Sequence, residues 1–223
     1  MVYIFDFTKG IKVSTLPRPE LIADLKNGLF VYKDSQFYTK SQADKLFNQL
    51  LNTIIYDKKS TVTIFGKTMP IPRKQTAYGD PGTTYSFSGT TVKAKKWNPI
   101  VLQIKNDVEK QTGQKFNFCL VNYYANGQDY IGYHKDDEQD LGPNPWIASV
   151  SFGQERKFYF KSDNKDLAVV KTKLNHGSLC VMMHPTNFYW KHSVPKESVK
   201  LCPNPRINLT FRYIEVPNDV IEV

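Results

Sequence analysis

The second half of the chain is a succession of short segments with the pattern of β-strands, and this pattern limits the fold more than any other feature. Between residues 207 and 214, apolar side chains alternate with polar ones. Such alternation is typical of a strand that has one face in a core. Strand-like segments cover residues 146–152, 156–160, 167–171, 178–183 and 207–214. Many short strands in succession favour two antiparallel sheets that face each other.

Two helices are expected ahead of these strands. Thr39 is followed three residues later by Gln42, which is the spacing of a capping box. The apolar residues Ala43, Leu46, Phe47, Leu50, Leu51 and Ile54 then follow at helical spacing. A second helix is expected from about Asn98 to Gly113, where the glycine ends it. We therefore predict an α+β fold, a double-stranded β-helix (jelly roll) with helices packed on one sheet.

The length of 223 residues fits one large domain with a short extension. We expect residues 1–38 to be an N-terminal extension of uncertain structure and residues 217–223 to be a C-terminal tail. The domain would cover residues 39–216, with the helices in 39–115 and the jelly-roll core in 116–216. Within the first of these parts, residues 61–65 and the turn at Gly66 predict a β-hairpin with an exposed tip.

Composition limits the partners and the compartment. The net charge of +9 favours a polyanionic partner, with nucleic acid ahead of an acidic membrane, although many basic proteins bind neither. The three cysteines include no Cys-x-x-Cys pair, which fits a reducing compartment and does not support a zinc or disulfide framework. No segment resembles a secretory signal or a membrane span. We expect an intracellular monomer without a membrane partner, nuclear if the source is a eukaryote.

Two histidines and one aspartate form a candidate metal site. His134 and Asp136 are two residues apart, so on an extended segment they point to the same face. With His192 they provide two imidazoles and a carboxylate, the ligand set of a facial triad for non-haem Fe(II). A His-x-Asp pair alone is a weak signal, and the order of the whole set carries the prediction. We expect structural hydrogen bonds, not metal binding, for His176 and His184.

The strand that ends the domain carries two arginines on one face. Arg206 and Arg212 share that face with Asn208 and Thr210, because even-numbered residues point the same way. Two guanidinium groups, an amide and a hydroxyl suit a small dicarboxylate such as 2-oxoglutarate. The alternative is a solvated basic strand face. Asn122 and Tyr124 also share a face, upstream of His134, and could complete the pocket.

Several longer motifs contain these residues. They cover residues 122–124, 131–138, 147–153, 176–179, 184–187 and 206–212. Together they resemble the AlkB family of Fe(II)/2-oxoglutarate dioxygenases, over roughly residues 40–215. Residues 64–67, 72–75 and 84–89 are most similar to the branch of that family that repairs duplex DNA in animals.

The resemblance implies a role for each matching residue. The iron ligands would be His134, Asp136 and His192. The 2-oxoglutarate ligands would be Asn122, Tyr124, Arg206, Thr210 and Arg212, with Asn208 nearby. The substrate residues would be Phe65, Gly66, Lys67, Arg73, Tyr85, Ser86, Phe87, Asp137 and Glu138. The family also has a nucleotide-recognition lid with a β-hairpin, and Phe65 to Lys67 would lie at the tip of that hairpin.

The implied activity is oxidative demethylation of N1-methyladenine and N3-methylcytosine in DNA, which consumes O2 and releases formaldehyde, succinate and CO2. Both lesions are cationic, so the rings of Tyr85 and Phe87 and the carboxylates of Asp137 and Glu138 suit them. A base in a duplex must be flipped out first, at a cost of a few kcal/mol, and Phe65 could fill the gap.

Alternatives remain open at the level of sequence. The branch that repairs duplex DNA has a basic loop at the position of residues 161–167. In this chain the segment is shorter and its basic residues are Lys161 and Lys165, which weakens the expectation of tight duplex binding. The same chemistry on RNA or single-stranded DNA is one alternative. A non-catalytic protein that binds damaged nucleic acid is a second, and a protein hydroxylase is a third. We favour alkylated DNA, with duplex ahead of single strand.

Overall fold

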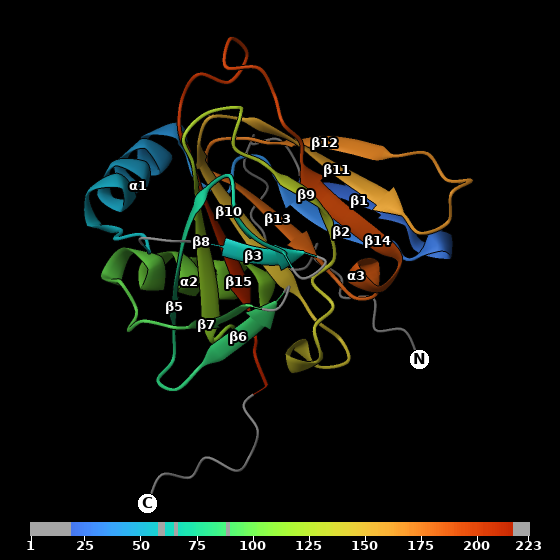
Figure 1. Ribbon diagram of the computed structural model, residues 1–223, viewed down its shortest axis with the longest axis horizontal. Helices are drawn as coiled ribbons and strands as arrows, with labels where there is room; N and C mark the ends of the chain where they lie inside the picture. Colours follow the sequence, from blue (N-terminus) through green and yellow to red (C-terminus); the bar gives the residue numbers. More distant parts are fainter. Residues whose placement is uncertain (1–18, 58–60, 65–66, 88–89, 216–223) are drawn as a thin grey trace, which may run out of the picture.

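Two antiparallel sheets face each other in the computed structural model, which describes residues 19–57, 61–64, 67–87 and 90–215 (Figure 1). The large sheet has the spatial order β1 (Glu20–Asp24), β2 (Leu29–Asp34), β13 (Ser178–Met182), β10 (Ile147–Gly153), β15 (Arg206–Arg212), β8 (Phe118–Tyr124) and β5 (Lys74–Gly79). The small sheet has the order β12 (Val170–Leu174), β11 (Arg156–Ser162), β14 (Trp190–Val194) and β9 (Ile131–His134).

Two hairpins, two long helices and three short helical segments complete the described chain. The hairpins are β3 (Thr61–Ile64) with β4 (Lys67–Pro70), and β6 (Thr84–Phe87) with β7 (Thr90–Lys93). The helices are α1 (Lys40–Thr53), α2 (Pro99–Thr112), the four-residue α3 (Thr186–Tyr189), and the 3-10 turns η1 (Leu25–Asn27) and η2 (Gln139–Leu141). None of the described helices has the length and apolarity that a membrane span requires.

Both predicted long helices are confirmed, because their ends are fixed by local hydrogen bonds. The Thr39 hydroxyl accepts from the Gln42 backbone amide, and the Gln42 side chain accepts from the Thr39 amide, which is a complete capping box. The Asn98 side chain caps α2 by accepting from the backbone amides of Ile100 and Val101. Gly113 ends α2 with φ of 70°, a left-handed conformation that a residue with a Cβ adopts only under strain.

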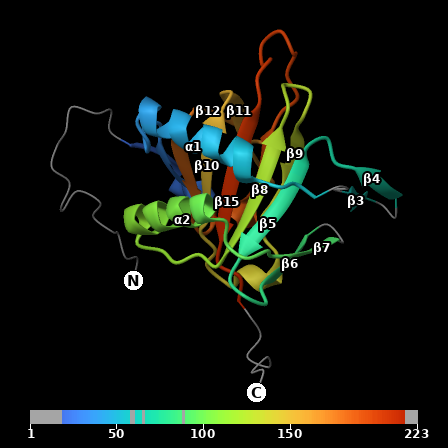
Figure 2. The ribbon, with the colours of Figure 1, turned by 90° about the vertical axis from the view of Figure 1, so that its left-hand side faces the viewer.

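The predicted layers are also confirmed. One core lies between α1, α2 and the large sheet, and it contains Leu50, Ile104 and Leu209. A second core lies between the two sheets, and it contains Leu120, Phe160 and Trp190. Figure 2 shows both long helices on the same side of the large sheet, with the two hairpins at the opposite side of the molecule. The fold is therefore a jelly roll whose inner space lies between the sheets, away from the helices.

The N-terminal boundary requires a correction. We expected residues 1–38 to be an extension of uncertain structure, but residues 20–34 form β1 and β2. These strands belong to the large sheet, because β2 pairs with β13 from Leu179↔Asp34 to Met182↔Val31. Alternate residues of β2 are buried, beginning with Leu29 and Val31. The alternation of β2 was too short to predict a strand from the sequence. Its partner strand β13 also lies far along the chain.

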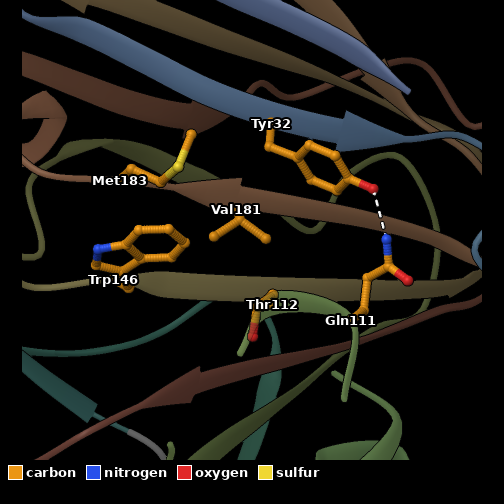
Figure 3. A pocket seen from close by; sticks show the side chains of 6 residues that line it. All are labelled: Tyr32, Gln111, Thr112, Trp146, Val181 and Met183. Atoms are coloured by element: carbon orange, nitrogen blue, oxygen red, sulfur yellow. Dashed lines mark hydrogen bonds between the residues drawn. The ribbon is translucent and has the colours of Figure 1, made fainter. Parts of the chain in front are cut away.

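Two hollows lie on the helix side of the large sheet. Figure 3 shows a cavity of about 10 Å³ beside the end of α2, lined by Tyr32, Gln111, Thr112, Trp146, Val181 and Met183. That volume is close to the room one water needs. A groove of about 370 Å³ lies between α1 and α2, with the Tyr38 hydroxyl donating to Asp107 at its floor. Neither hollow contains a residue of the predicted site.

Candidate functional site

The three predicted metal ligands meet in the space between the sheets. His134 ends β9 and pairs directly with His192 on β14, so the two imidazoles lie side by side with ring centroids 4.2 Å apart. Asp136 follows two residues after the strand, and its carboxylate lies 3.9 Å from His192 Nε2. One ligand atom from each residue lies within 4.8 Å of the other two. This spacing allows one ion to contact all three.

Burial keeps both imidazoles in the form that binds metal. It lowers the pKa of His192 to about 3, and the adjacent His134 adds to that effect. Burial also lowers the pKa of His134. Neutral imidazole has a free lone pair for a metal. Nδ1 of His134 lies 2.9 Å from the Gly132 carbonyl oxygen; a proton on Nδ1 would donate there and leave Nε2 free.

The Asp136 carboxylate is ionised although it is buried. Burial by itself would raise its pKa, but the Arg212 guanidinium outweighs that effect and the pKa is lowered to about 2. Nη2 of Arg212 lies 2.9 Å from both carboxylate oxygens. The guanidinium also lies over the Tyr85 ring, 5.0 Å from its centroid. Arg212 therefore holds a candidate metal ligand in place, and its Nε has no partner among the described residues.

Arg206 is a buried cation with unsatisfied donors. Its side chain is 1% exposed, and its Nη2 donates to the Ser151 hydroxyl at 2.9 Å. Its Nε and Nη1 have no partner in the described part of the chain. The guanidinium lies over the Tyr124 ring at 5.0 Å, and burial lowers its pKa to about 10. Unpaired buried donors are costly, so this site fits an anion such as a carboxylate that accepts from one of these nitrogens.

The remaining predicted co-substrate residues are buried beside these arginines, and several already hold one another. Asn208 donates to the Ser149 hydroxyl at 2.8 Å and accepts from the Thr210 hydroxyl at 3.1 Å. Asn122 Oδ1 accepts from Arg73 Nε at 2.9 Å and from Gln75 Nε2 at 2.8 Å. Arg73, which we expected on the substrate side, thus contacts a residue of the predicted 2-oxoglutarate pocket.

Sequence reasoning did not single out Gln75 or Ser151. Gln75 lies in the motif at residues 72–75, two residues from Arg73, but the motif gave it no role of its own. Ser151 could have been found only from its place opposite Asn208 on the neighbouring strand, which is a pairing between β10 and β15.

Aromatic and acidic side chains lie on the other side of Arg212. The Tyr85 hydroxyl donates to Glu138 at 2.5 Å, and the Tyr85 and Phe87 rings lie 5.3 Å apart. Burial raises the pKa of Glu138. Asp137 is exposed, and Ser86 is exposed beside Thr91. Lys67 begins β4, whereas Phe65 and Gly66 lie outside the described residues.

Of the other two histidines, His176 forms the expected hydrogen bonds, whereas the contact found for His184 is with an aromatic ring. Nδ1 of His176 accepts from the Gly153 amide at 2.8 Å, and its Nε2 lies 3.1 Å from Asp44. His184 packs its ring edge-on against Phe188. Neither belongs to the group of possible metal ligands found among the described residues.

Comparison with known proteins shows the family. The model of the 2OG-Fe(II) oxygenase superfamily matches residues 30–212. The DNA oxidative demethylase ALKBH2 of Homo sapiens is 46% identical over 186 residues, which are 79% of this chain and 70% of the relative. The alpha-ketoglutarate-dependent dioxygenase alkB homolog 3 of Bos taurus is 37% identical over 187 residues, 80% of this chain and 64% of the relative.

Solved structures show the same fold at low identity. The structure of OsALKBH1 aligns with a TM-score of 0.58 at 14% identity, over 82% of this chain and 96% of that one. A prolyl hydroxylase from Trichoplax adhaerens, in complex with a hypoxia inducible factor peptide, aligns with a TM-score of 0.57 at 13% identity. That match covers 86% of this chain and 85% of the other.

Proposed function

This chain belongs to the AlkB family of the 2OG-Fe(II) oxygenase superfamily, and from that membership we propose that it demethylates alkylated bases in DNA. It is a dioxygenase that uses Fe(II), 2-oxoglutarate and O2. The proposed lesions are N1-methyladenine and N3-methylcytosine. The observation that carries the proposal is the buried His134–Asp136–His192 cluster beside the unsatisfied donors of Arg206.

The co-substrate half of the site is well prepared for a dicarboxylate. Arg206 would donate to one carboxylate from Nε or from Nη1, which both lack a partner among the described residues. Arg212 would keep Asp136 ionised and oriented, and its free Nε could donate to a second acceptor. Iron bound at this site would supply the oxidation of the N-methyl group by O2, which is coupled to the conversion of 2-oxoglutarate to succinate and CO2. The hydroxylated methyl group leaves as formaldehyde.

The substrate half suits a cationic base. The Tyr85 and Phe87 rings would lie against a methylated base, and the Glu138 carboxylate is held towards them by the Tyr85 hydroxyl. Asp137 is exposed and free to meet a base that enters from solvent. A neutral base would gain less from this combination, which favours the damaged over the normal base.

Direct measurement of demethylation tests the proposal. Oligonucleotides with one lesion, as single strands and as duplexes, are incubated with Fe(II), 2-oxoglutarate and ascorbate. We expect each lesion to lose the mass of one CH2 group, and the Asp136→Ala variant to lose this activity. If the wild-type protein consumes 2-oxoglutarate but demethylates no DNA, the proposal is wrong, and RNA and protein substrates become the alternatives.

We further propose that a duplex is preferred and that Phe65 assists base flipping. The Phe65→Ala variant should lose activity on duplexes and retain it on single strands, because only the duplex leaves a gap to fill. Equal losses on both substrates would contradict that role. Single-stranded DNA is the second candidate, because the β11–β12 connection carries Lys165 between Asp163 and Asp166 and so has no net positive charge. In a eukaryote we place the protein in the nucleus, as a monomer.

A further inference from the structure

Arg156 is a buried cation that the proposed chemistry does not use. It begins β11, and 1% of it is exposed. Its Nε pairs with the Glu197 carboxylate at 3.3 Å, and its Nη1 and Nη2 donate to backbone carbonyl oxygens. These carbonyls belong to Asn126, Gly127, Asp129 and Pro195, at 3.2, 3.4, 2.9 and 2.8 Å. All three nitrogens of the guanidinium group therefore have acceptors.

The acceptors of Arg156 lie in two connections between strands. Residues 125–130 join β8 to β9, and residues 195–205 join β14 to β15; we call them the β8–β9 and β14–β15 connections. Both lie at the same end of the two sheets (Figure 2). The Glu197 amide donates to the Gly127 carbonyl, and the Gly127 amide donates to the Cys202 carbonyl, both at 2.8 Å. A Cβ at Gly127 would lie 2.7 Å from the Glu197 carbonyl oxygen, so this contact leaves no room for a side chain.

Each connection joins one half of the candidate site to the other. The β8–β9 connection leads from Tyr124, a proposed 2-oxoglutarate residue, to the strand of the candidate metal ligand His134. The β14–β15 connection leads from the strand of His192 to Arg206. Connecting segments are as a rule more mobile than the strands they join. Arg156 ties both connections to each other and to the start of β11.

Arg156 also contacts Tyr124 itself. Its guanidinium lies over the Tyr124 ring, 5.7 Å from the centroid, and that of Arg206 lies over the same ring at 5.0 Å. Tyr124 is buried. Burial lowers the pKa of Arg206, and the positive charge of Arg156 adds to that effect. Arg156 can thus influence the proposed co-substrate pocket in two ways, through the position of Tyr124 and through its charge.

We propose that Arg156 is a positioning residue, which sets the distance between the co-substrate residues and the metal ligands by holding Tyr124 and both connections. This proposal rests on the proposed roles of Tyr124 and Arg206 in binding 2-oxoglutarate. A guanidinium group carries five N–H donors in one rigid plane, so it fixes several acceptors at once. An ammonium group is a compact point charge and does not reproduce that geometry. The arrangement of its contacts, more than its charge, is therefore what Arg156 contributes.

Binding of 2-oxoglutarate at saturating Mn²⁺, measured by calorimetry without nucleic acid, tests this assignment. Arg156→Lys keeps the charge, and Arg156→Gln removes it. We expect both variants to raise the Kd of 2-oxoglutarate by about ten- to a hundredfold, the usual effect of losing a side chain that orients a ligand residue. A wild-type Kd in Arg156→Lys would show that charge alone suffices and would overturn the proposal.

Gly127→Ala tests the same role while Arg156 remains in place, and it decides the matter if the Arg156 variants do not fold. Its Cβ would press on the Glu197 carbonyl and separate the two connections, so the Kd of 2-oxoglutarate should rise here too. Leu50→Ala is the control, because its cavity lowers stability on the helix side of the large sheet. This control should bind 2-oxoglutarate as the wild type does. A wild-type Kd in Gly127→Ala, or an equal rise in Leu50→Ala, would overturn the proposal.

Demethylation of DNA by the wild type, measured in parallel, separates this role from the proposed function. Wild-type protein that does not demethylate DNA, with Kd values that change as expected in the variants, contradicts the proposed function alone. Wild-type protein that demethylates DNA, with unchanged Kd values in Arg156→Lys and Gly127→Ala, contradicts the positioning role alone.

Discussion

Arg206 is a buried cation for which we propose a role in binding 2-oxoglutarate, at a cost to the stability of the unliganded protein. A buried guanidinium with two unpaired donors is destabilising until an anion arrives. We expect Arg206→Met to raise KM for 2-oxoglutarate by about ten- to a hundredfold, from the loss of one charge-assisted contact or two weaker ones. The variant without ligand should melt at the same or a higher temperature than the wild type. A variant that melts lower yet binds 2-oxoglutarate normally would contradict this role.

Arg73 contacts Asn122 of the proposed 2-oxoglutarate pocket, and a variant can show whether it contributes more to binding of the co-substrate or to binding of DNA. Because its Nε donates to Asn122, we expect Arg73→Ala to raise KM for 2-oxoglutarate more than it weakens binding to DNA. Arg73→Lys should not restore the KM, since an ammonium group lacks the fixed Nε donor. Separate titrations of the co-substrate and of a duplex measure the two effects. Weakened DNA binding with an unchanged KM would instead support our original expectation for this residue.

At the scale of elements, what could be predicted depended on how local the determining contacts are. The caps of α1 and α2 lie within a few residues of the helix ends, so both boundaries were predictable. The strand expected at residues 167–171 is instead β12 at Val170–Leu174, because its register is set by β11. Strands β1 and β2 were not predicted, because β2 joins the large sheet by pairing with β13, about 145 residues further along the chain.

The segment after β14 contains a buried carboxylate that pairs with two basic side chains. Glu197 accepts from Arg156 Nε at 3.3 Å and pairs with Lys157 at 3.1 Å, and its side chain is 7% exposed. Burial alone would raise its pKa, but Lys157 and Arg156 outweigh that effect and lower it. Glu197→Gln should therefore reduce the free energy of unfolding by about 1.5 kcal/mol at neutral pH, which is typical of one hydrogen bond to a charged group.

The pH dependence of that loss follows from the lowered pKa. The ionised Glu197 contributes its full stability above the ordinary pKa of 4.5, and the contribution disappears as the pH falls through the lower folded value. Wild type and Glu197→Gln should converge in acid, as measured by denaturant unfolding at several pH values. Asp57→Asn is the control, because its pair with Lys95 is about 40% exposed and is expected to contribute less than about 1 kcal/mol. A constant difference at all pH values would exclude the ion pair as the cause.

For the whole molecule, ligand and fold should be thermodynamically linked. A metal and 2-oxoglutarate bind only the folded chain, so at 100 times their Kd each should stabilise it by about 2.7 kcal/mol. Thermal unfolding with redox-inert Mn²⁺ and 2-oxoglutarate measures this without turnover. His192→Ala should abolish the metal-dependent part and leave the fold intact. Stabilisation that persists in that variant would place the metal elsewhere.

The site shows the same division between local and distant determinants. His134 and Asp136 could be assigned from their spacing, and His192 joined them because the order of the whole set matched a known pattern. The partners of the arginines could not be assigned, since Asp136 meets Arg212 and Asn122 meets Arg73 only through tertiary packing. The sequence thus predicts which side chains gather between the sheets, and the structure determines which of them hold one another.

The pairing of His134 with His192 also has a mechanical consequence. Strand β9 is an edge strand of the small sheet, and its register with β14 is irregular just beyond the two histidines. An outermost strand frays more readily than a central one. An ion held by both imidazoles would join β9 to β14 as a cross-link does. Loading with metal would then close the margin of the sheet as well as prepare the chemistry, and the amide protons of β9 would exchange more slowly with it bound.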